Sequence, residues 1–324
     1  MAPESSVLRI IALVFVFLPL TDSINFKLPA IFNFGDSNSD TGELVVDAMD
    51  LPFLNAYLDS ISTPSFHKGC NFAAAGSTIE PPTAQAVSPF SFRVQVAQFV
   101  RFKARVLRLL AKGQNDLAGA FYSKIFDQIL ALIPLILTEF ETGIKILYEQ
   151  GARNFWVHNT GPLGCLAQNI AKFGTNQSSL NELGCVSKHN QAAKAFNLHF
   201  HALCKKLQSR YTDSNFTYVD IYTIQSNLIA NYSKFGFEQP IMVCCGYGGP
   251  PLNYDSQIGC GKTKVLNGTT MTAKACDDRS EYVNWDGIHY SEAANQYVSS
   301  EILTGKYSDP PFSDKMPFLL DLKF

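Results

Sequence analysis

The sequence has little net charge and no dense cluster of basic residues. Its 324 residues contain 26 Lys and Arg against 28 Asp and Glu, so the formal net charge is −2. A basic stripe is what binding to nucleic acid or to an anionic membrane surface requires, and its absence argues against both partners. Because 46% of the residues are hydrophobic and only 17% are charged, the chain can bury a large core. We therefore expect one large folded domain with a small partner of low charge.

The sequence also lacks a hydrophobic run long enough to cross a bilayer. The apolar run at residues 10–20 has 11 residues, whereas a spanning helix needs about 20. This run follows Arg9 and precedes Thr21, Asp22 and Ser23, which is the order of a secretory signal peptide. We predict a signal peptide at residues 1–23 and an exported, soluble mature chain; a membrane anchor is the alternative reading of the run.

A second apolar segment, at residues 121–148, is interrupted by charged side chains. Those charges make it unsuitable as a membrane span. We predict instead a buried amphipathic helix that bends at Pro134.

No Cys-x-x-Cys pair occurs among the eight cysteines, which disfavours a zinc site. Cysteines of exported proteins commonly form disulfides. The cysteines expected to pair are Cys165, Cys185, Cys244, Cys245, Cys260 and Cys276. A bridge between the adjacent residues 244 and 245 would be strained, so we expect one or both of them to reach 260 and 276. Cys70 and Cys204 are predicted to stay free and buried.

Four Asn-x-Ser/Thr sequons agree with export as a glycoprotein. The acceptor residues are Asn176, Asn215, Asn231 and Asn267. Each sequon alone is weak evidence, because a chain of this size contains several by chance.

Short β-rich runs alternate with helical patterns, and no repeat or linker divides the chain. This alternation is typical of an α/β layered domain with a mostly parallel sheet. The predicted strands are residues 30–34, 155–158 and 216–222, and the predicted helices are 191–211 and 291–303. Parallel sheets bind ligands at the carboxyl ends of their strands, so chemistry is expected from Gly35 onward.

The turn after the first predicted strand presents Ser37, a candidate nucleophile, next to Gly35 and Asp36. A serine hydroxyl is a weak nucleophile and needs a base together with a group that orients this base. Asp286 and His289, three residues apart on a predicted turn, can supply the orienting carboxylate and the base. By themselves they are equally compatible with a surface turn or the start of a helix.

A serine that accepts an acyl group also needs donors for the developing oxyanion. The Ala-Ala-Ala-Gly-Ser run at residues 73–77 offers the backbone N–H of Gly76, and Gly-Gln-Asn-Asp at 113–116 offers the amide of Asn115. Taken separately, these segments read as a turn and a helix cap. The Gly-x-Ser-x-Gly elbow of the α/β-hydrolases is absent, which disfavours that fold.

Four segments together resemble the plant branch of the GDSL esterase/lipases, also called SGNH hydrolases. They are the turn with Ser37, residues 73–77, residues 113–116 and the segment with Asp286 and His289. Residues 157–165, 244–249 and 283–290 look like the same branch, so the resemblance covers nearly the whole mature chain. It implies a secreted serine esterase or lipase acting on small-molecule or cell-wall esters, without a metal or other cofactor. The implied fold is a flavodoxin-like three-layer α/β/α sandwich, here a single domain over residues 24–324.

The resemblance also implies a role for each site residue. Ser37 is the nucleophile, His289 the general base and acid, and Asp286 its orienter. The N–H groups of Ser37 and Gly76 and the side chain of Asn115 form the oxyanion hole.

The sequence departs from the family in two places. After Gly42 the chain runs directly into Glu43, without the stretch that normally follows the nucleophile turn. Before Gly113 the family has an apolar central strand, whereas residues 95–112 have helical periodicity with interspersed Lys and Arg. We interpret the chain as a shortened or alternatively spliced enzyme that lacks a central strand, unless residues 105–111 are recruited as that strand. The alternative to an active esterase is a catalytically impaired glycoprotein that acts at most as a binding module.

Overall fold

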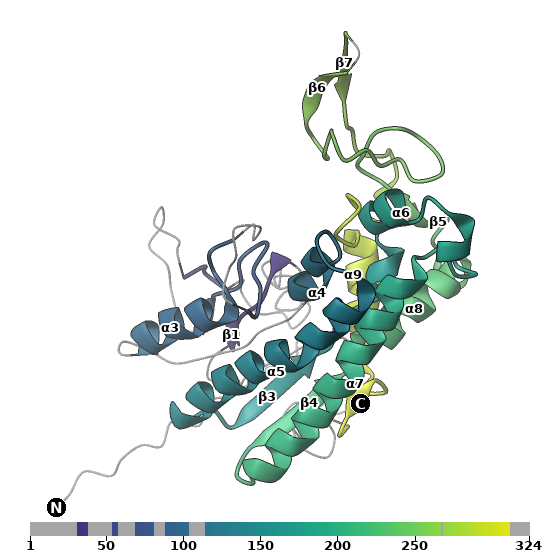
Figure 1. Ribbon diagram of the computed structural model, residues 1–324. Coiled ribbons are helices and arrows are strands. Elements are labelled where there is room, and N and C mark those ends of the chain that lie inside the picture. The colour runs from purple at the N-terminus through teal and green to yellow at the C-terminus, as the bar shows by residue number, and fades with distance from the viewer. Residues whose placement is uncertain are drawn as a thin grey trace, which may run out of the picture.

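A computed structural model describes residues 31–37, 54–57, 69–80, 88–103 and 114–311, with the exception of residue 267. Helices and strands alternate along this part of the chain, and the helices lie beside the strands (Figure 1). The fold is therefore α/β, as the sequence predicts.

The described strands form small sheets in which most pairings are parallel. β1 pairs with β2, β3 with β4 and β5 with β8, all parallel, whereas β9 joins β4 and β6 joins β7 antiparallel. Their bounds are β1 Ile31–Asn33, β2 Gly69–Asn71, β3 Asn154–His158, β4 Asn215–Val219, β5 Gln239–Val243, β6 Thr263–Leu266, β7 Thr269–Thr272, β8 Tyr282–Asn284 and β9 Ser308–Asp309.

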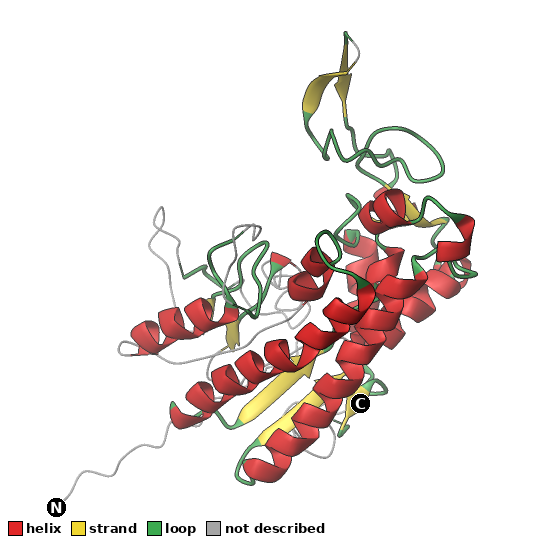
Figure 2. Ribbon diagram, viewed as in Figure 1, coloured by secondary structure: helices red, strands yellow, loops and turns green. Residues whose placement is uncertain are grey.

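The described helices include two long ones, α5 and α7, which run side by side across β3 and β4 (Figure 2). Pro134 lies inside α5. The bounds are α3 Phe92–Lys103, α4 Gln114–Ala120, α5 Phe126–Glu149, α6 Ala167–Phe173, α7 Ser187–Arg210, α8 Ile221–Ala230 and α9 Glu292–Leu303.

Two apolar cores lie on opposite faces of the β3–β4 pair. Phe155 and Val157 of β3 pack into a core with α3, α5 and α7, whereas Trp156 packs into a second core with α8 and α9. Successive side chains of a strand point to opposite faces of its sheet, so this alternation requires helices on both sides. The sheet around β3 and β4 is thus the middle of three layers.

The predicted loss of a central strand is compatible with the described pairings. Among the described strands, β1 pairs with β2 and β3 pairs with β4, and no described strand joins these two pairs. The predicted helix at residues 95–112 is confirmed as far as Lys103 by α3, and residues 104–112 lie outside the described part.

The predicted strand at residues 216–222 is wrong at its end. β4 stops at Val219, and Asp220 caps α8 by accepting a 3.1 Å hydrogen bond from the backbone N–H of Thr223. Tyr222 is therefore helical. A capping carboxylate outweighs the β propensity of the apolar residues that follow it.

Three disulfides confirm the expected cysteine pairing and settle its connectivity. The bridges are Cys165–Cys185, Cys244–Cys276 and Cys245–Cys260. Cys70 and Cys204 are free and buried, as predicted. The adjacent Cys244 and Cys245 are therefore bridged to two different loops. Cys245 also donates its N–H to the carbonyl of Trp285, so both bridges lie beside the segment that leads from β8 to Asp286.

Candidate active site

Ser37 lies in the turn that follows β1. The turn begins after Asn33 and passes through Gly35, whose φ of 142° is a conformation that glycine adopts without steric cost. Gly35 is buried, and its N–H and carbonyl are both bound by the side chain of Gln95 at 2.8 Å. Ser37 itself is half-buried, so part of the residue remains accessible to solvent.

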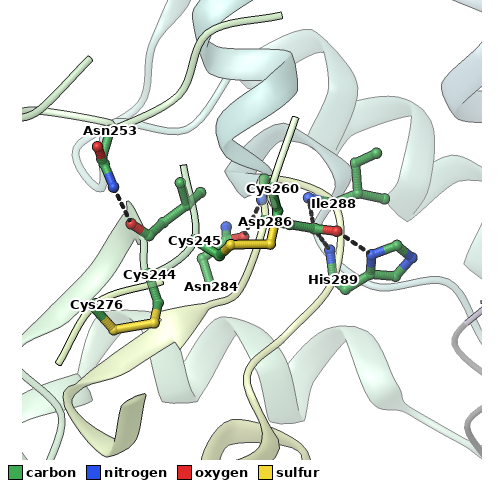
Figure 3. Close-up of a disulfide and its surroundings, with 11 residues drawn as sticks. Cys244, Cys245, Asn253, Cys260, Cys276, Asn284, Asp286, Ile288 and His289 are labelled. Atoms are coloured by element: carbon green, nitrogen blue, oxygen red, sulfur yellow. Dashed lines mark hydrogen bonds and ion pairs between the residues drawn. A yellow bond between two sulfur atoms is a disulfide. The ribbon is translucent and has the colours of Figure 1, made fainter. Parts of the chain in front are cut away.

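Asp286 and His289 lie on a tight turn between β8 and α9. Oδ1 of Asp286 accepts hydrogen bonds from the backbone N–H groups of Ile288 and His289, both at 2.9 Å. Gly287 supports the turn with a φ of 100° and donates its N–H to Asn284. The other oxygen, Oδ2, lies 2.8 Å from Nδ1 of His289 (Figure 3). The carboxylate therefore fixes both the backbone turn and the imidazole ring.

The structure brings the predicted nucleophile and base together. Nε2 of His289 lies 2.8 Å from Oγ of Ser37, although the two residues are 252 positions apart in the chain. The order Ser37 to His289 to Asp286 is the hydrogen-bonded series that a serine nucleophile requires. With Nδ1 donating to Asp286, Nε2 is left to accept the serine proton.

The charges of the site favour an imidazolium. The hydrogen bond to Asp286 raises the pKa of His289 above its ordinary value of 6.5, against the effect of burial, and the charges of Asp286 and Asp36 act in the same direction. Burial raises the pKa of Asp286, but the hydrogen bond and charge of His289 and two backbone N–H groups outweigh it and lower the pKa. Asp286 therefore stays ionised and stabilises the protonated ring.

The segment with Gly76 lies beside the nucleophile turn. The N–H of Ala74 donates to the carbonyl of Gly35 at 3.0 Å, and Gly76 follows two residues later with a φ of 73°. Asn115 lies in the first turn of α4, and its side chain is outside the described part of the structure. Its role as an oxyanion donor stays a prediction.

Asp116 links α4 to the segment that follows Gly76. Its carboxylate accepts hydrogen bonds from the N–H groups of Ile79 and Glu80 at 2.8 and 3.0 Å. Burial raises the pKa of Asp116 to about 7, although these two bonds lower it. Asp116 is thus a structural hydrogen-bonder that holds the neighbourhood of Asn115 next to the neighbourhood of Gly76.

Gln95 contacts the turn that carries Ser37, although no sequence motif marks it as a site residue. It lies on the apolar stripe of α3 beside Val96, and its side chain is fully buried. A single polar residue on a buried helical stripe was the available signal, because a buried amide needs hydrogen-bond partners. The pattern could not indicate which partners these are.

The sequons differ in their surroundings. Asn176 is exposed, whereas Asn215 lies within β4 and donates to Asn154, and Asn231 is half-buried and donates to Asn227. Asn267 lies outside the described residues. Of the described acceptors, Asn176 has the most space for a glycan.

Within the described part of the chain, no group of three or more His, Cys, Asp or Glu residues could hold a metal ion.

The predicted helix at 121–148 corresponds to α5, which begins at Phe126. No helix among the described residues is long and apolar enough to span a membrane.

Comparison with known proteins places the chain among ester hydrolases. The family described as GDSL-like Lipase/Acylhydrolase matches residues 31–302. The chain is 55% identical to GDSL esterase/lipase At1g54790 of Arabidopsis thaliana, over 95% of this chain and 96% of the relative. It is 53% identical to GDSL esterase/lipase At3g05180 of the same plant (90% and 92%) and 36% identical to GDSL esterase/lipase ENOD8 of Medicago truncatula (91% and 91%).

The first of these comparisons also measures how much this chain lacks. It extends over 390 positions, whereas 95% of 324 residues is about 308, so 390 − 308 leaves about 82 positions at which this chain has a gap. Within the matched region this relative therefore has about 82 residues without a counterpart in this chain.

Proposed function

Because this chain belongs to the GDSL-like lipase/acylhydrolase family and is a carboxylic ester hydrolase, we propose that it is a secreted serine esterase that works through an acyl-enzyme on Ser37. The observation that carries this proposal is the pair of 2.8 Å contacts that connect Ser37 to His289 and His289 to Asp286. Its substrate is a small-molecule or cell-wall ester.

In the first half of the reaction, Oγ of Ser37 attacks the ester carbonyl while Nε2 of His289 takes the hydroxyl proton. Asp286 stabilises the imidazolium through the bond from Nδ1. The negative oxygen of the tetrahedral intermediate is bound by the N–H groups of Ser37 and Gly76 and by the Asn115 amide. When the C–O bond breaks, His289 returns the proton to the leaving alcohol, and the acyl group stays on Ser37.

In the second half, His289 deprotonates a water molecule that attacks the acyl-enzyme. A second tetrahedral intermediate forms in the same place and collapses, and the proton passes from His289 to Oγ of Ser37. The carboxylic acid leaves and the serine is regenerated. Every proton transfer uses the one imidazole nitrogen that faces the serine.

The test is hydrolysis of p-nitrophenyl acetate and butyrate across a pH series, with buffer alone as the control for spontaneous hydrolysis. Since the base must be neutral and the pKa of His289 is raised, turnover should rise with pH through a midpoint above 6.5. An absence of hydrolysis, or turnover independent of pH from 5 to 9, would contradict the proposal.

Export to the extracellular space, apoplast or cell wall is supported by three features. Residues 1–23 have the order of a signal peptide. Three disulfides are typical of an oxidising compartment. The exposed Asn176 can accept a glycan.

A second candidate function is favoured by the shortened chain. About 82 positions of the relative lie opposite gaps in this chain. On this hypothesis the residues of the triad remain while stability and the oxyanion hole are impaired, and the chain acts at most as a secreted binding module.

Restoring the missing central segment distinguishes the two candidates. The corresponding segment of the 55% identical relative would be inserted before Gly113. If a five-residue strand adds five net hydrogen bonds of about 1 kcal/mol each, the melting temperature should rise by roughly 10 °C. Turnover of p-nitrophenyl butyrate should rise as well, because Asn115 would follow its normal strand. Equal melting temperature and turnover in both chains would contradict the shortened-enzyme interpretation.

A further inference from the structure

The N–H of Gly35 needs a partner that the paired strands do not supply. β1 ends at Asn33, and beyond it the carbonyl of the buried Gly35 still accepts from the N–H of Ala74 at 3.0 Å, whereas the N–H of Gly35 points to α3. A buried backbone N–H without a partner is costly, so the turn is stable only if another group accepts from it. Ser37 is two residues further along, so whatever holds Gly35 also determines where the hydroxyl of Ser37 lies.

The side chain of Gln95 binds both groups of Gly35. Its Oε1 accepts from the N–H of Gly35 at 2.8 Å, and its Nε2 donates to the carbonyl of Gly35 at 2.8 Å. The same Nε2 donates to the carbonyl of Phe90 at 3.0 Å. Both amide protons and one acceptor site are therefore used, which fixes the orientation of the amide.

The Gly35 carbonyl also accepts from Ala74, two residues before Gly76. Gln95 thus acts at the point where the nucleophile turn and the proposed oxyanion segment meet. A displacement of Gly35 would change the position of both relative to His289.

The helix that carries Gln95 packs against the strand and turn before Ser37. Phe99, one helical turn after Gln95, packs edge-on against Phe32, Phe34 and Phe72, each with ring centroids 5.9 Å away. These rings come from β1, from the nucleophile turn and from the segment after β2. This packing holds the backbone of Gln95 beside the turn that carries Ser37.

We propose that Gln95 is a positioning residue that sets the distance between Oγ of Ser37 and Nε2 of His289. The inference rests on the proposed function and names a residue outside the triad that this function depends on. Displacing a reacting group by about 1 Å can cost roughly 100-fold in rate. Loss of the amide should therefore lower kcat by roughly 10- to 100-fold while KM stays within about twofold.

The test compares Gln95→Met with a matched control elsewhere in the fold. Gln208 of α7 forms a similar backbone clamp, accepting from the N–H of Phe216 at 2.9 Å and donating to the carbonyl of Ser214 at 2.7 Å. These partners lie at the start of β4, away from its carboxyl end. Gln208→Met removes the same kind of clamp, so it should lower the melting temperature and leave kcat unchanged.

Turnover of p-nitrophenyl butyrate is measured for both variants and the wild type, well below all three melting temperatures. A selective kcat loss in Gln95→Met supports the proposal; equal kcat in the two variants would overturn it. Gln95→Glu is a second variant, measured in case Gln95→Met does not fold. It keeps the size of the side chain and one acceptor oxygen but loses the NH₂ donor. A folded Gln95→Glu chain with wild-type kcat would also overturn the proposal. A wild-type chain without turnover would instead overturn the proposed function and this role with it.

Discussion

Replacing Ser37 with alanine is expected to lower kcat for p-nitrophenyl butyrate by roughly 10⁴-fold or more, because no acyl-enzyme can form. Oγ of Ser37 is the atom that faces Nε2 of His289. KM should change little, since the methyl group still fits the site. Initial rates over a range of ester concentrations, with the rate in buffer subtracted, measure this effect.

Ser300→Ala is the matched control. Ser300 is exposed on α9, and its hydroxyl donates to the carbonyl of Tyr297 at 2.8 Å. The same chemical change at this position should leave kcat within about twofold. A Ser37→Ala chain that keeps the turnover of Ser300→Ala would show that another group performs the chemistry.

Asp286→Asn is expected to lower kcat by roughly 10³- to 10⁴-fold with little change in fold. An asparagine oxygen can still accept from the N–H groups of Ile288 and His289, so the turn is retained. The amide NH₂ then faces Nδ1 of His289, which must become an acceptor. The ring proton moves to Nε2, where it points at Ser37 and blocks the base.

The pH profile separates this effect from a general loss of structure. In the wild type, the bond to Asp286 is the largest cause of the raised pKa of His289. Without that charge the pKa should fall, so the residual activity of Asp286→Asn should begin at a lower pH. Asp278→Asn is the control, since the exposed Asp278 accepts from the N–H of Ser280 but lies outside the triad. An unchanged profile in Asp286→Asn would contradict the role of Asp286.

Much of the site could be predicted from the sequence because its parts are local patterns. Gly35 and Ser37 form a short turn after an apolar strand, and Asp286 and His289 are three residues apart. Each pattern can be recognised from a few neighbouring residues. In the structure, His289 lies within hydrogen-bond distance of both Asp286 and Ser37. The alternation of Phe155, Trp156 and Val157 between two cores likewise follows from the strand period.

Other features depend on contacts between distant segments and could not be predicted. The pairing of Cys244 with Cys276 is one case, because both possible partners satisfy the sequence spacing. The end of β4 is another, since the capping bond of Asp220 competes with the β propensity of the next residues. Gln95 is the third, because its partner Gly35 is 60 positions away.

The measurement that tests the central claim most directly is labelling with a fluorophosphonate, followed by peptide mapping by mass spectrometry. The reagent forms a bond to a serine oxygen with loss of fluoride, and it reacts quickly only where a base and oxyanion donors are assembled. We predict one labelled peptide, with the modification on Ser37, and loss of ester hydrolysis in proportion to labelling. A fully hydrolytic chain without label on Ser37, or with the label on another serine, would contradict the account.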